Sequence, residues 1–205
     1  MNPAIDYEAQ LVTYTQKVFR GLLDSMARPG KINTIEPFPL QYTAKETDFA
    51  PYVLGIACTL LDIEVTFSVA APNLAKLVTD MEFHTNSRAV SPETADYLLL
   101  TSGDDPGMMH TAKRGNLDFP DHGAAVILVV ADLSEVQPPY DNPAITLNLN
   151  GPGILGEKSV WVAGVNQFFF EAFRMVNGEF PLGIDLILVG GEKIACFPRS
   201  VTITW

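Results

Sequence analysis

Cationic side chains are scarce in this sequence. Its 205 residues contain 13 lysines and arginines against 24 aspartates and glutamates, which gives a formal net charge of −11. Proteins that bind the phosphates of nucleic acids usually present a basic stripe on their surface. Nucleic-acid binding is therefore not expected. An anionic ligand would need a few local arginines to reverse the field of the whole molecule.

Cysteines and long apolar runs are also few. Cys58 and Cys196 are the only two cysteines, and their wide separation favours a reducing compartment over a disulfide scaffold. The opening residues, MNPAIDYEAQ, lack the basic and apolar segments of a signal peptide. The longest apolar run, residues 123–131, is about half as long as a membrane span requires. We expect a soluble cytoplasmic protein without a membrane partner.

The distribution of apolar residues predicts one α/β domain. No segment of residues 1–205 resembles a flexible linker, an internal repeat or a low-complexity region. Strand-like and helix-like patterns alternate along much of the chain, which is typical of a parallel sheet. Residues 124–133, AAVILVVADL, are continuously apolar and resemble a central strand covered on both faces. The predicted fold has three layers, with a mixed, largely parallel sheet and helices on both faces.

Apolar spacing and turn residues predict the individual elements. Helices are predicted over residues 11–27, 49–62, 72–84 and 166–178. Strands are predicted over residues 31–35, 63–69, 96–102, 124–133, 144–151, 159–165, 183–190 and 192–197, with a last short strand after Pro198. The long loop over residues 103–123, with one helical turn near Met109, is a candidate for mobility.

Several motifs that suggest chemistry fail on closer inspection. The segment GPGILGEKS, residues 151–159, resembles a phosphate-binding loop, but Glu157 interrupts the motif and a strand follows where a helix is required. It is better interpreted as a turn between strands. His84, His110 and His122 lack the spacing of metal ligands, and no nucleophile motif is present. The sequence therefore predicts neither a metal site nor catalytic residues.

Arg28, Asp185 and Arg199 are the candidate ligand-binding residues. The sequence Arg28-Pro29-Gly30 must end the first helix, which places Arg28 at the negative end of the helix dipole. Asp185 lies in a predicted interior strand, where a carboxylate needs a donor, and Arg199 and Arg28 are the partners to consider first. A structural ion pair is the favoured interpretation, and a ligand contact is the alternative.

The helix over residues 166–178 carries more phenylalanines than one buried stripe can cover. Phe168 and Phe170 point to nearly opposite sides of a helix with 3.6 residues per turn. The helix is therefore either enclosed within the domain or part of a subunit interface. In the second case, Phe170→Asp is expected to break subunit association and leave the monomer folded.

Two long segments lie near the two ends of the sequence, FRGLLDSMARPGKI, residues 19–32, and FPLGIDLILVGGEKIACFPRS, residues 180–200. Together they resemble the PhnH family, the H subunits of the bacterial carbon-phosphorus lyase system. The resemblance implies a subunit of the complex that takes phosphorus from alkylphosphonates. In that family the G, H, I and L proteins together transfer an alkylphosphonate onto the ribose of ATP and displace adenine. The H subunit is implied to be structural, without a cofactor.

The resemblance also implies a fold and partners. The fold is expected to be similar to the large domain of pyridoxal-phosphate-dependent transferases. A homodimer is expected to assemble with other core subunits of the G, I and J types. One rival hypothesis is a pyridoxal-phosphate enzyme, but no lysine has a suitable setting at the end of an apolar strand. Another is a stand-alone binder in which Arg28 and Arg199 clamp a phosphonate or a triphosphate.

Overall fold

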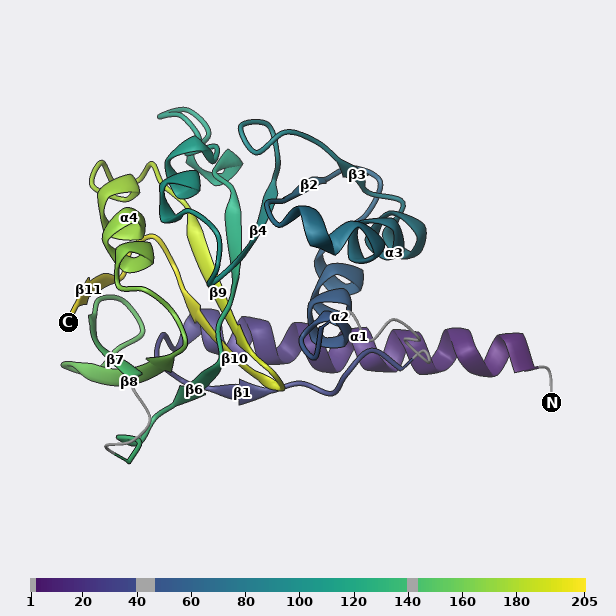
Figure 1. Cartoon of the computed structure of the whole chain (residues 1–205), viewed down its shortest axis with the longest axis horizontal. Coiled ribbons are helices and arrows are strands. Elements are labelled where there is room, and N and C mark those ends of the chain that lie inside the picture. The colour runs from purple at the N-terminus through teal and green to yellow at the C-terminus, as the bar shows by residue number, and fades with distance from the viewer. Residues whose placement is uncertain (1–2, 40–46, 140–143) are drawn as a thin grey trace.

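A seven-stranded sheet forms the centre of the molecule (Figure 1). The structure is a computed structural model that describes residues 3–39, 47–139 and 144–205. The strands of this sheet, in spatial order, are β1 (Asn33–Thr34), β10 (Lys193–Phe197), β9 (Asp185–Gly190), β5 (Ala125–Val129), β4 (Tyr97–Thr101), β2 (Thr66–Val69) and β3 (Arg88–Ala89). From β9 to β3 all neighbours are parallel, whereas β10 and β1 join antiparallel. A mixed α/β fold with a largely parallel sheet is therefore confirmed.

A second, four-stranded antiparallel sheet was not predicted as a separate unit. Its strands, in spatial order, are β11 (Thr202–Thr204), β7 (Ala144–Asn150), β8 (Lys158–Ala163) and β6 (Asp132–Ser134). The predicted strand over residues 124–133 is in fact two strands, because β5 ends at Val129 and β6 begins at Asp132 in the other sheet.

Helices cover one face of the large sheet, and a mixed layer covers the other. The helices α1 (Pro3–Ala27), α2 (Ala50–Leu60) and α3 (Ala75–Thr85) share one hydrophobic core with the large sheet. The helix α4 (Phe168–Val176) and the small sheet share the second core, on the opposite face. The prediction of helices on both faces is therefore correct, but most of the second outer layer is sheet.

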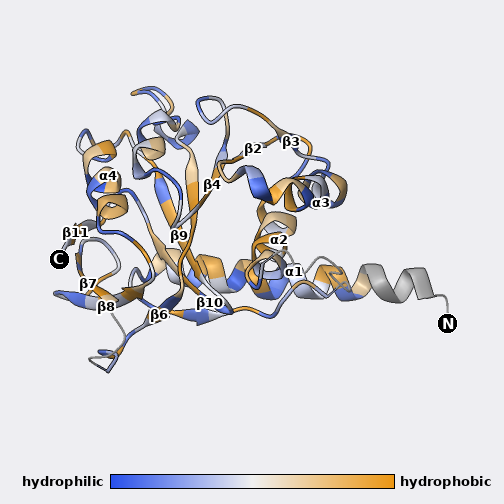
Figure 2. Ribbon diagram, viewed as in Figure 1, coloured by the Kyte–Doolittle hydropathy of each residue, from blue (hydrophilic) through white to orange (hydrophobic). Residues whose placement is uncertain are grey.

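The central strand β5 contributes to both cores. Val126 and Leu128 belong to the core under α4, and Ile127 and Val129 belong to the core under α1 to α3. Because successive side chains of a strand point to opposite faces, a continuously apolar strand must be covered on both sides. Figure 2 shows hydrophobic residues along the central strands. The position predicted for this strand, in the middle of the sheet, is confirmed.

The helix α4 buries one side against the domain and exposes the other. Phe169, Phe170 and Phe173 are each at most 1 % exposed, whereas Phe168 is 53 % exposed. The prediction that a second side of this helix is covered is wrong, because Phe168 lies outside the core that the two sheets form with the helix. The prediction that Phe170 forms a subunit interface is therefore wrong, because Phe170 is part of the core. The N-cap of the helix is Gln167, one residue after the predicted Asn166, and Asn166 Oδ1 accepts a hydrogen bond from the Phe168 amide at 3.0 Å.

The segment between β4 and β5 contributes Met109, Ala112 and Ala124 to the core, and its other residues are exposed or half-buried. It contains the short 3-10 helices η2 (Pro106–Thr111) and η3 (Pro120–His122). Met109, in the helical turn that was predicted, is fully buried beside α4.

In the described part of the chain, no helix is long and apolar enough to cross a membrane.

The first helix ends against the turn between β7 and β8. Gly30 has a left-handed φ of 85°, so the chain reverses there and enters β1. Gly153 in the turn has a φ of 83°, and a Cβ at this position would overlap the carbonyl oxygen of Ala27. The motifs ARPG and GPGI, far apart in the sequence, thus form one close backbone junction.

Candidate functional site

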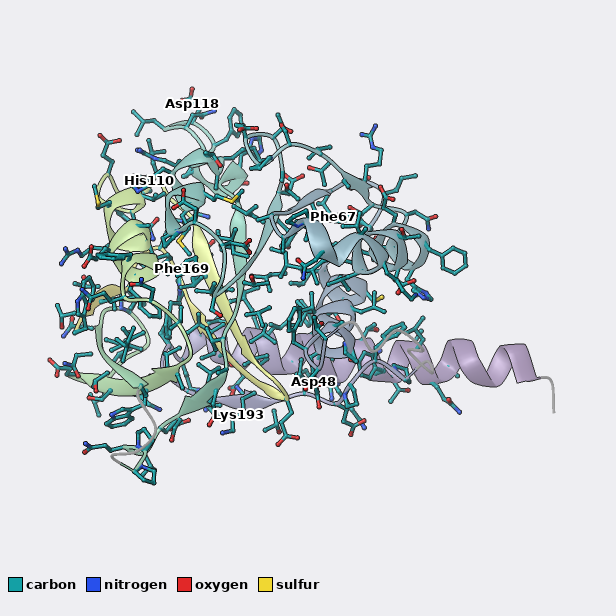
Figure 3. All side chains as sticks on the ribbon, viewed as in Figure 1. Asp48, Phe67, His110, Asp118, Phe169 and Lys193 are labelled. Atoms are coloured by element: carbon teal, nitrogen blue, oxygen red, sulfur yellow. The ribbon has the colours of Figure 1, made fainter. Side chains whose placement is uncertain are left out.

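A hollow of about 630 Å³ lies where the parallel strands β2, β4, β5 and β9 begin. Tyr97, Ala125 and Asp185 open three of these strands, and Val65 directly precedes the fourth. The hollow is lined by these four residues and by Asp96, Lys113, Asp121, His122, Gly123 and Arg199. Figure 3 shows Asp118, from the neighbouring loop, at this edge of the molecule.

Asp185 and Arg199 form an extensive ion pair at one side of the hollow. Arg199 Nη2 donates to Asp185 Oδ2 at 2.7 Å, and the Nε and the backbone amide of Arg199 donate to Oδ1 at 3.2 and 2.8 Å. Arg199 Nη1 also donates to the carbonyl of Pro120 at 2.5 Å. The arginine side chain is only 13 % exposed. The structural ion pair expected for Asp185 is therefore confirmed, with Arg199 as the partner.

Gly123 allows the loop to approach this ion pair. A Cβ on Gly123 would overlap the guanidinium of Arg199 and the carbonyl oxygen of Gly183. Backbone hydrogen bonds join the same segment to β9, because Asp185 donates to Ala124 at 3.1 Å and Gly183 donates to Arg114 at 2.9 Å. Arg199 thus fastens η3 to the start of β9.

A second ion pair, between Asp96 and Lys113, lies at the hollow. Lys113 Nζ donates to Asp96 Oδ1 at 2.5 Å, and the hydroxyl and amide of Thr66 donate to Oδ2 at 2.6 and 2.8 Å. Burial alone would raise the pKa of Asp96, but the hydrogen bonds and the charge of Lys113 outweigh it and hold the pKa below its ordinary value. Asp96 is therefore stabilised as a carboxylate.

The chemistry of the hollow is acidic and does not favour anions. Both cations that line it, Lys113 and Arg199, are already bound to carboxylates of the same chain. Asp121 adds a further negative charge, and His122 is stacked on Phe119 with a centroid distance of 5.0 Å. Asp96 and Lys113 could not be predicted as site residues, because neither lies in a motif.

Arg28 lines a different hollow, of about 440 Å³, between the end of α1 and the turn that follows β7. It forms an ion pair with Asp24, one helical turn earlier, and its side chain is 59 % exposed. Lys31 binds the same aspartate at 2.5 Å, and Lys158 binds Glu135 at 2.8 Å. The clamp of Arg28 and Arg199 around one ligand, which was a rival hypothesis, is not assembled in this structure, since the two arginines line separate hollows. A separate contact of either arginine with a ligand stays a prediction.

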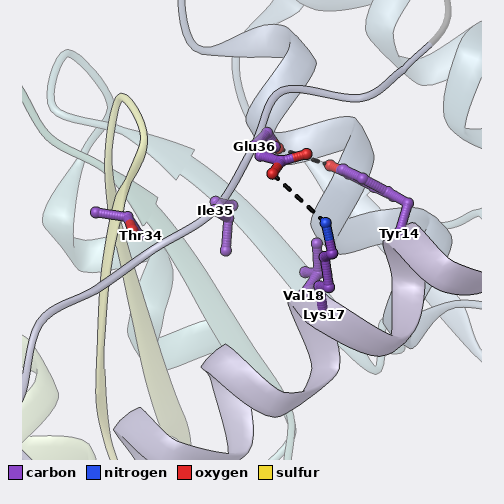
Figure 4. Close-up of a pocket in the computed structure, with 6 residues that line it drawn as sticks. All are labelled: Tyr14, Lys17, Val18, Thr34, Ile35 and Glu36. Atoms are coloured by element: carbon purple, nitrogen blue, oxygen red, sulfur yellow. Dashed lines mark hydrogen bonds and ion pairs between the residues drawn. The ribbon is translucent and has the colours of Figure 1, made fainter.

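A smaller hollow of about 70 Å³, between α1 and the segment after β1, has a structural role (Figure 4). Tyr14 donates its hydroxyl to the carbonyl of Glu36 at 2.9 Å, and Lys17 lies 3.6 Å from the Glu36 carboxylate. Burial, followed by the nearby Cys58 and Glu36, raises the pKa of Tyr14. These contacts fasten α1 to the chain that follows β1.

Other reactive groups are kept neutral or lack partners for catalysis. Burial raises the pKa of Cys58 to about 12, and burial and Asp185 raise that of Cys196 to about 12, so neither thiol is activated as a nucleophile. Burial lowers the pKa of His84. Within the described residues, no group of three or more histidine, cysteine, aspartate or glutamate side chains is arranged to hold a metal ion.

The lysines of the described chain are all engaged in ion pairs. The pairs are Lys17–Glu36, Lys31–Asp24, Lys76–Asp80, Lys113–Asp96, Lys158–Glu135 and Lys193–Asp132. Lys45 lies outside the described residues. A lysine that forms a Schiff base must present a neutral amine to its cofactor, which these contacts oppose.

Fold and site together define a class of protein: a mixed α/β domain whose charged hollow is held by ion pairs within the chain. The comparison with protein families then gives the particular family. Residues 8–204 match the family described as "Bacterial phosphonate metabolism protein (PhnH)", and the chain belongs to this family.

Two curated proteins show the same relationship. A protein of Stutzerimonas stutzeri is named "Putative C-P lyase subunit protein HtxG". It is 30 % identical over 188 residues, which cover 92 % of this chain and 85 % of the relative's own length. A protein of Rhizobium meliloti (strain 1021) is named alpha-D-ribose 1-methylphosphonate 5-triphosphate synthase subunit PhnH. It is 27 % identical over 204 residues, which cover 95 % of this chain and 92 % of its own.

Proposed function

We propose that this chain is a subunit of a carbon-phosphorus lyase complex and contributes to alpha-D-ribose 1-methylphosphonate 5-triphosphate synthase activity. In this reaction an alkylphosphonate is transferred onto the ribose of ATP and adenine is released. Membership of the PhnH family over residues 8–204 is the observation that carries the proposal. The relative named as a subunit of this synthase, aligned over 95 % of this chain, supports it.

The role proposed for this subunit is structural, and the chain alone is proposed to be inactive. The charged groups of the 630 Å³ hollow support this role, because Lys113 and Arg199 are bound to Asp96 and Asp185 and cannot at the same time neutralise a triphosphate. The high pKa values of Cys58 and Cys196 also oppose nucleophilic catalysis.

The finer features of the proposal concern fold, location and assembly. We propose a single domain over residues 1–205, similar in fold to the large domain of pyridoxal-phosphate-dependent transferases but without that cofactor. The ion pairs of the described lysines support the absence of a Schiff base. A cytoplasmic homodimer, bound to core subunits of the G, I and J types, completes the proposal.

Growth on a phosphonate tests the function in the cell. Deletion of the gene in its own bacterium should abolish growth with methylphosphonate as the only phosphorus source and leave growth on phosphate unchanged. A plasmid copy should restore growth. A deletion strain that still grows on methylphosphonate would contradict the proposal.

Adenine release tests the role of the chain itself. The purified chain with ATP and methylphosphonate should release no adenine, whereas adding it to the other subunits of the synthase should raise adenine release. Turnover by the isolated chain would overturn the structural role but not the membership of the complex. A separate experiment, isothermal titration of the purified chain with ATP and with methylphosphonate, tests whether Arg28, Asp185 and Arg199 contact a ligand.

A further inference from the structure

Loops gather at the end of the molecule where the parallel strands begin. Residues 61–65, 90–96, 113–124 and 177–184 lead into β2, β4, β5 and β9 respectively. Three of these loops line the hollow of about 630 Å³. We name this region the strand-start face.

The strand-start face has an excess of negative charge. Its cations Lys113, Arg114 and Arg199 are each bound to a carboxylate of the same chain. Five further carboxylates on this face have no cation within ion-pair distance among the described residues, and they are Asp62, Glu64, Glu93, Asp118 and Asp121. Arg88, opposite Thr66 at the sheet edge, lies beside this face and belongs to none of these pairs. The face is therefore complementary to a basic surface.

Large apolar side chains are exposed among these carboxylates. Ile63 is 75 % exposed, Leu117 is 78 % exposed and Phe119 is 53 % exposed. Ile63 lies two residues before Val65, which lines the hollow, and Phe119 stacks on His122, which also lines it. Apolar groups within a polar rim are typical of protein–protein interfaces.

The position and charge of the hollow argue against a small anionic ligand. Open α/β sheets usually bind such ligands at the carboxyl ends of their strands, whereas this hollow lies at the amino ends. ATP and phosphonates are anions, and the unpaired carboxylates would repel them. A protein segment with lysine or arginine side chains avoids this repulsion.

The loops of this face are held in place before any partner binds. Arg199 fastens the η3 segment to Asp185, and Lys113 fastens the next part of the loop to Asp96. Asp96 is joined in turn to Thr66 at the start of β2. Preformed loops lose little conformational entropy on binding, which favours docking.

We infer that the strand-start face docks a basic, partly apolar segment of another subunit of the complex. This inference rests on the proposed function, because it takes the partner from that assembly. Lysine or arginine side chains of the partner pair with Glu64, Asp118 and Asp121, and an apolar side chain covers Leu117 and Phe119. The internal ion pairs stay intact when the partner docks.

Charge reversal tests the inference by co-purification. The tagged chain is co-expressed with the G, I and J proteins of the same bacterium, and partner recovery is measured for the wild type and for Glu64→Lys/Asp118→Lys/Asp121→Lys. The triple variant should recover roughly tenfold less partner or worse. Recovery by the wild type should also fall when salt is raised from about 0.05 M to about 0.5 M.

The control reverses exposed carboxylates elsewhere. Asp48→Lys/Glu157→Lys/Glu192→Lys makes the same change in net charge outside the strand-start face, at exposed carboxylates with no ion-pair partner among the described residues. Asp48 lies well away from Asp118 in Figure 3. This variant should recover partners like the wild type, and both variants should keep the wild-type circular dichroism spectrum and melting temperature.

The outcomes separate the inference from the proposed function. If the strand-start variant recovers as much partner as the wild type, or if the control loses as much, the docking face is wrong and the proposed function stands. If the wild type recovers no partner under any salt condition, membership of the complex fails, and the docking face fails with it.

Discussion

Arg199 is the residue that joins most segments at the candidate site. Its side chain contacts Asp185 at the start of β9 and the carbonyl of Pro120, and it is only 13 % exposed. Removal of the cation leaves the carboxylate of Asp185 partly buried without its charge partner. We expect Arg199→Met to lower the free energy of unfolding by about 2 kcal/mol in urea titrations.

An exposed arginine gives the control for this prediction. Arg174 lies over the ring of Trp205, 5.0 Å from its centroid, and forms no ion pair with a carboxylate of the described residues. Arg174→Met should cost less than about 1 kcal/mol, because an exposed cation–π contact is weak. Equal losses for the two variants would show that Arg199 is not a special fastening point.

The carboxylate of Asp96 makes the free energy of unfolding depend on pH. Its folded pKa lies below the ordinary value of 3.8, since hydrogen bonds and the charge of Lys113 outweigh burial. A group with a lowered folded pKa stabilises the protein above its unfolded pKa, and this contribution is lost as pH falls through the folded pKa. Asp96→Asn should therefore be less stable than the wild type at neutral pH, and the difference should shrink below about pH 4.

Urea unfolding at several pH values measures this dependence. The matched control is Asp118→Asn, since Asp118 is exposed and has no ion-pair partner among the described residues. This substitution should change the free energy of unfolding by less than about 0.5 kcal/mol at neutral pH, because it removes no ion pair. A constant difference for Asp96→Asn would contradict the role of the Asp96–Lys113 pair.

At the scale of elements, the end of α1 depends on a glycine in a distant turn. Gly153 has a φ of 83°, and its Cα lies against the carbonyl of Ala27, so an added Cβ meets both backbone strain and a clash. Gly156, in the same turn, has a φ of 75° but no atom within 4 Å of an added Cβ. The two glycines therefore separate the clash from the strain.

Alanine substitution at both positions gives the test. Gly156→Ala should cost about 1 kcal/mol, the cost of a left-handed conformation. Gly153→Ala should cost about 2 kcal/mol more, because α1 must move from the turn. Thermal and urea unfolding measure both values, and equal costs would mean that the junction does not hold the helix.

The elements that the sequence predicts well are those whose pattern is local. Residues 124–129 read correctly as a strand buried on both faces, and α4 begins two residues after Asn166, the start that the sequence predicts. The change of sheet between Val129 and Asp132 could not be predicted, because the apolar run continues through it. Likewise, the Asp185–Arg199 pair follows from a charge in a buried strand, whereas Lys113 lies in a loop whose path depends on tertiary contacts.

At the scale of the whole molecule, α4 has one side in the core and one side exposed. Phe170 is fully buried, and a carboxylate there would lie unpaired among apolar side chains. We expect Phe170→Asp to cost more than about 4 kcal/mol and to leave little folded protein, seen as loss of the circular dichroism signal. Soluble, folded Phe170→Asp protein would contradict this assignment to the core.

The exposed side of α4 is the surface on which the proposed homodimer can be tested. Phe168 and Met175, seven residues apart, lie on the same side of the helix and are 53 % and 67 % exposed. Nearby, Phe180 is 67 % exposed, so an apolar surface extends beyond the helix.

Sedimentation of the wild type should give twice the 22.4 kDa mass of one chain. Phe168→Asp/Met175→Asp should give the mass of a single chain, with a fold like that of the wild type, because neither side chain supports the core. A double variant that stays dimeric would place the dimer contact elsewhere, and a wild type that sediments as one chain would refute the homodimer.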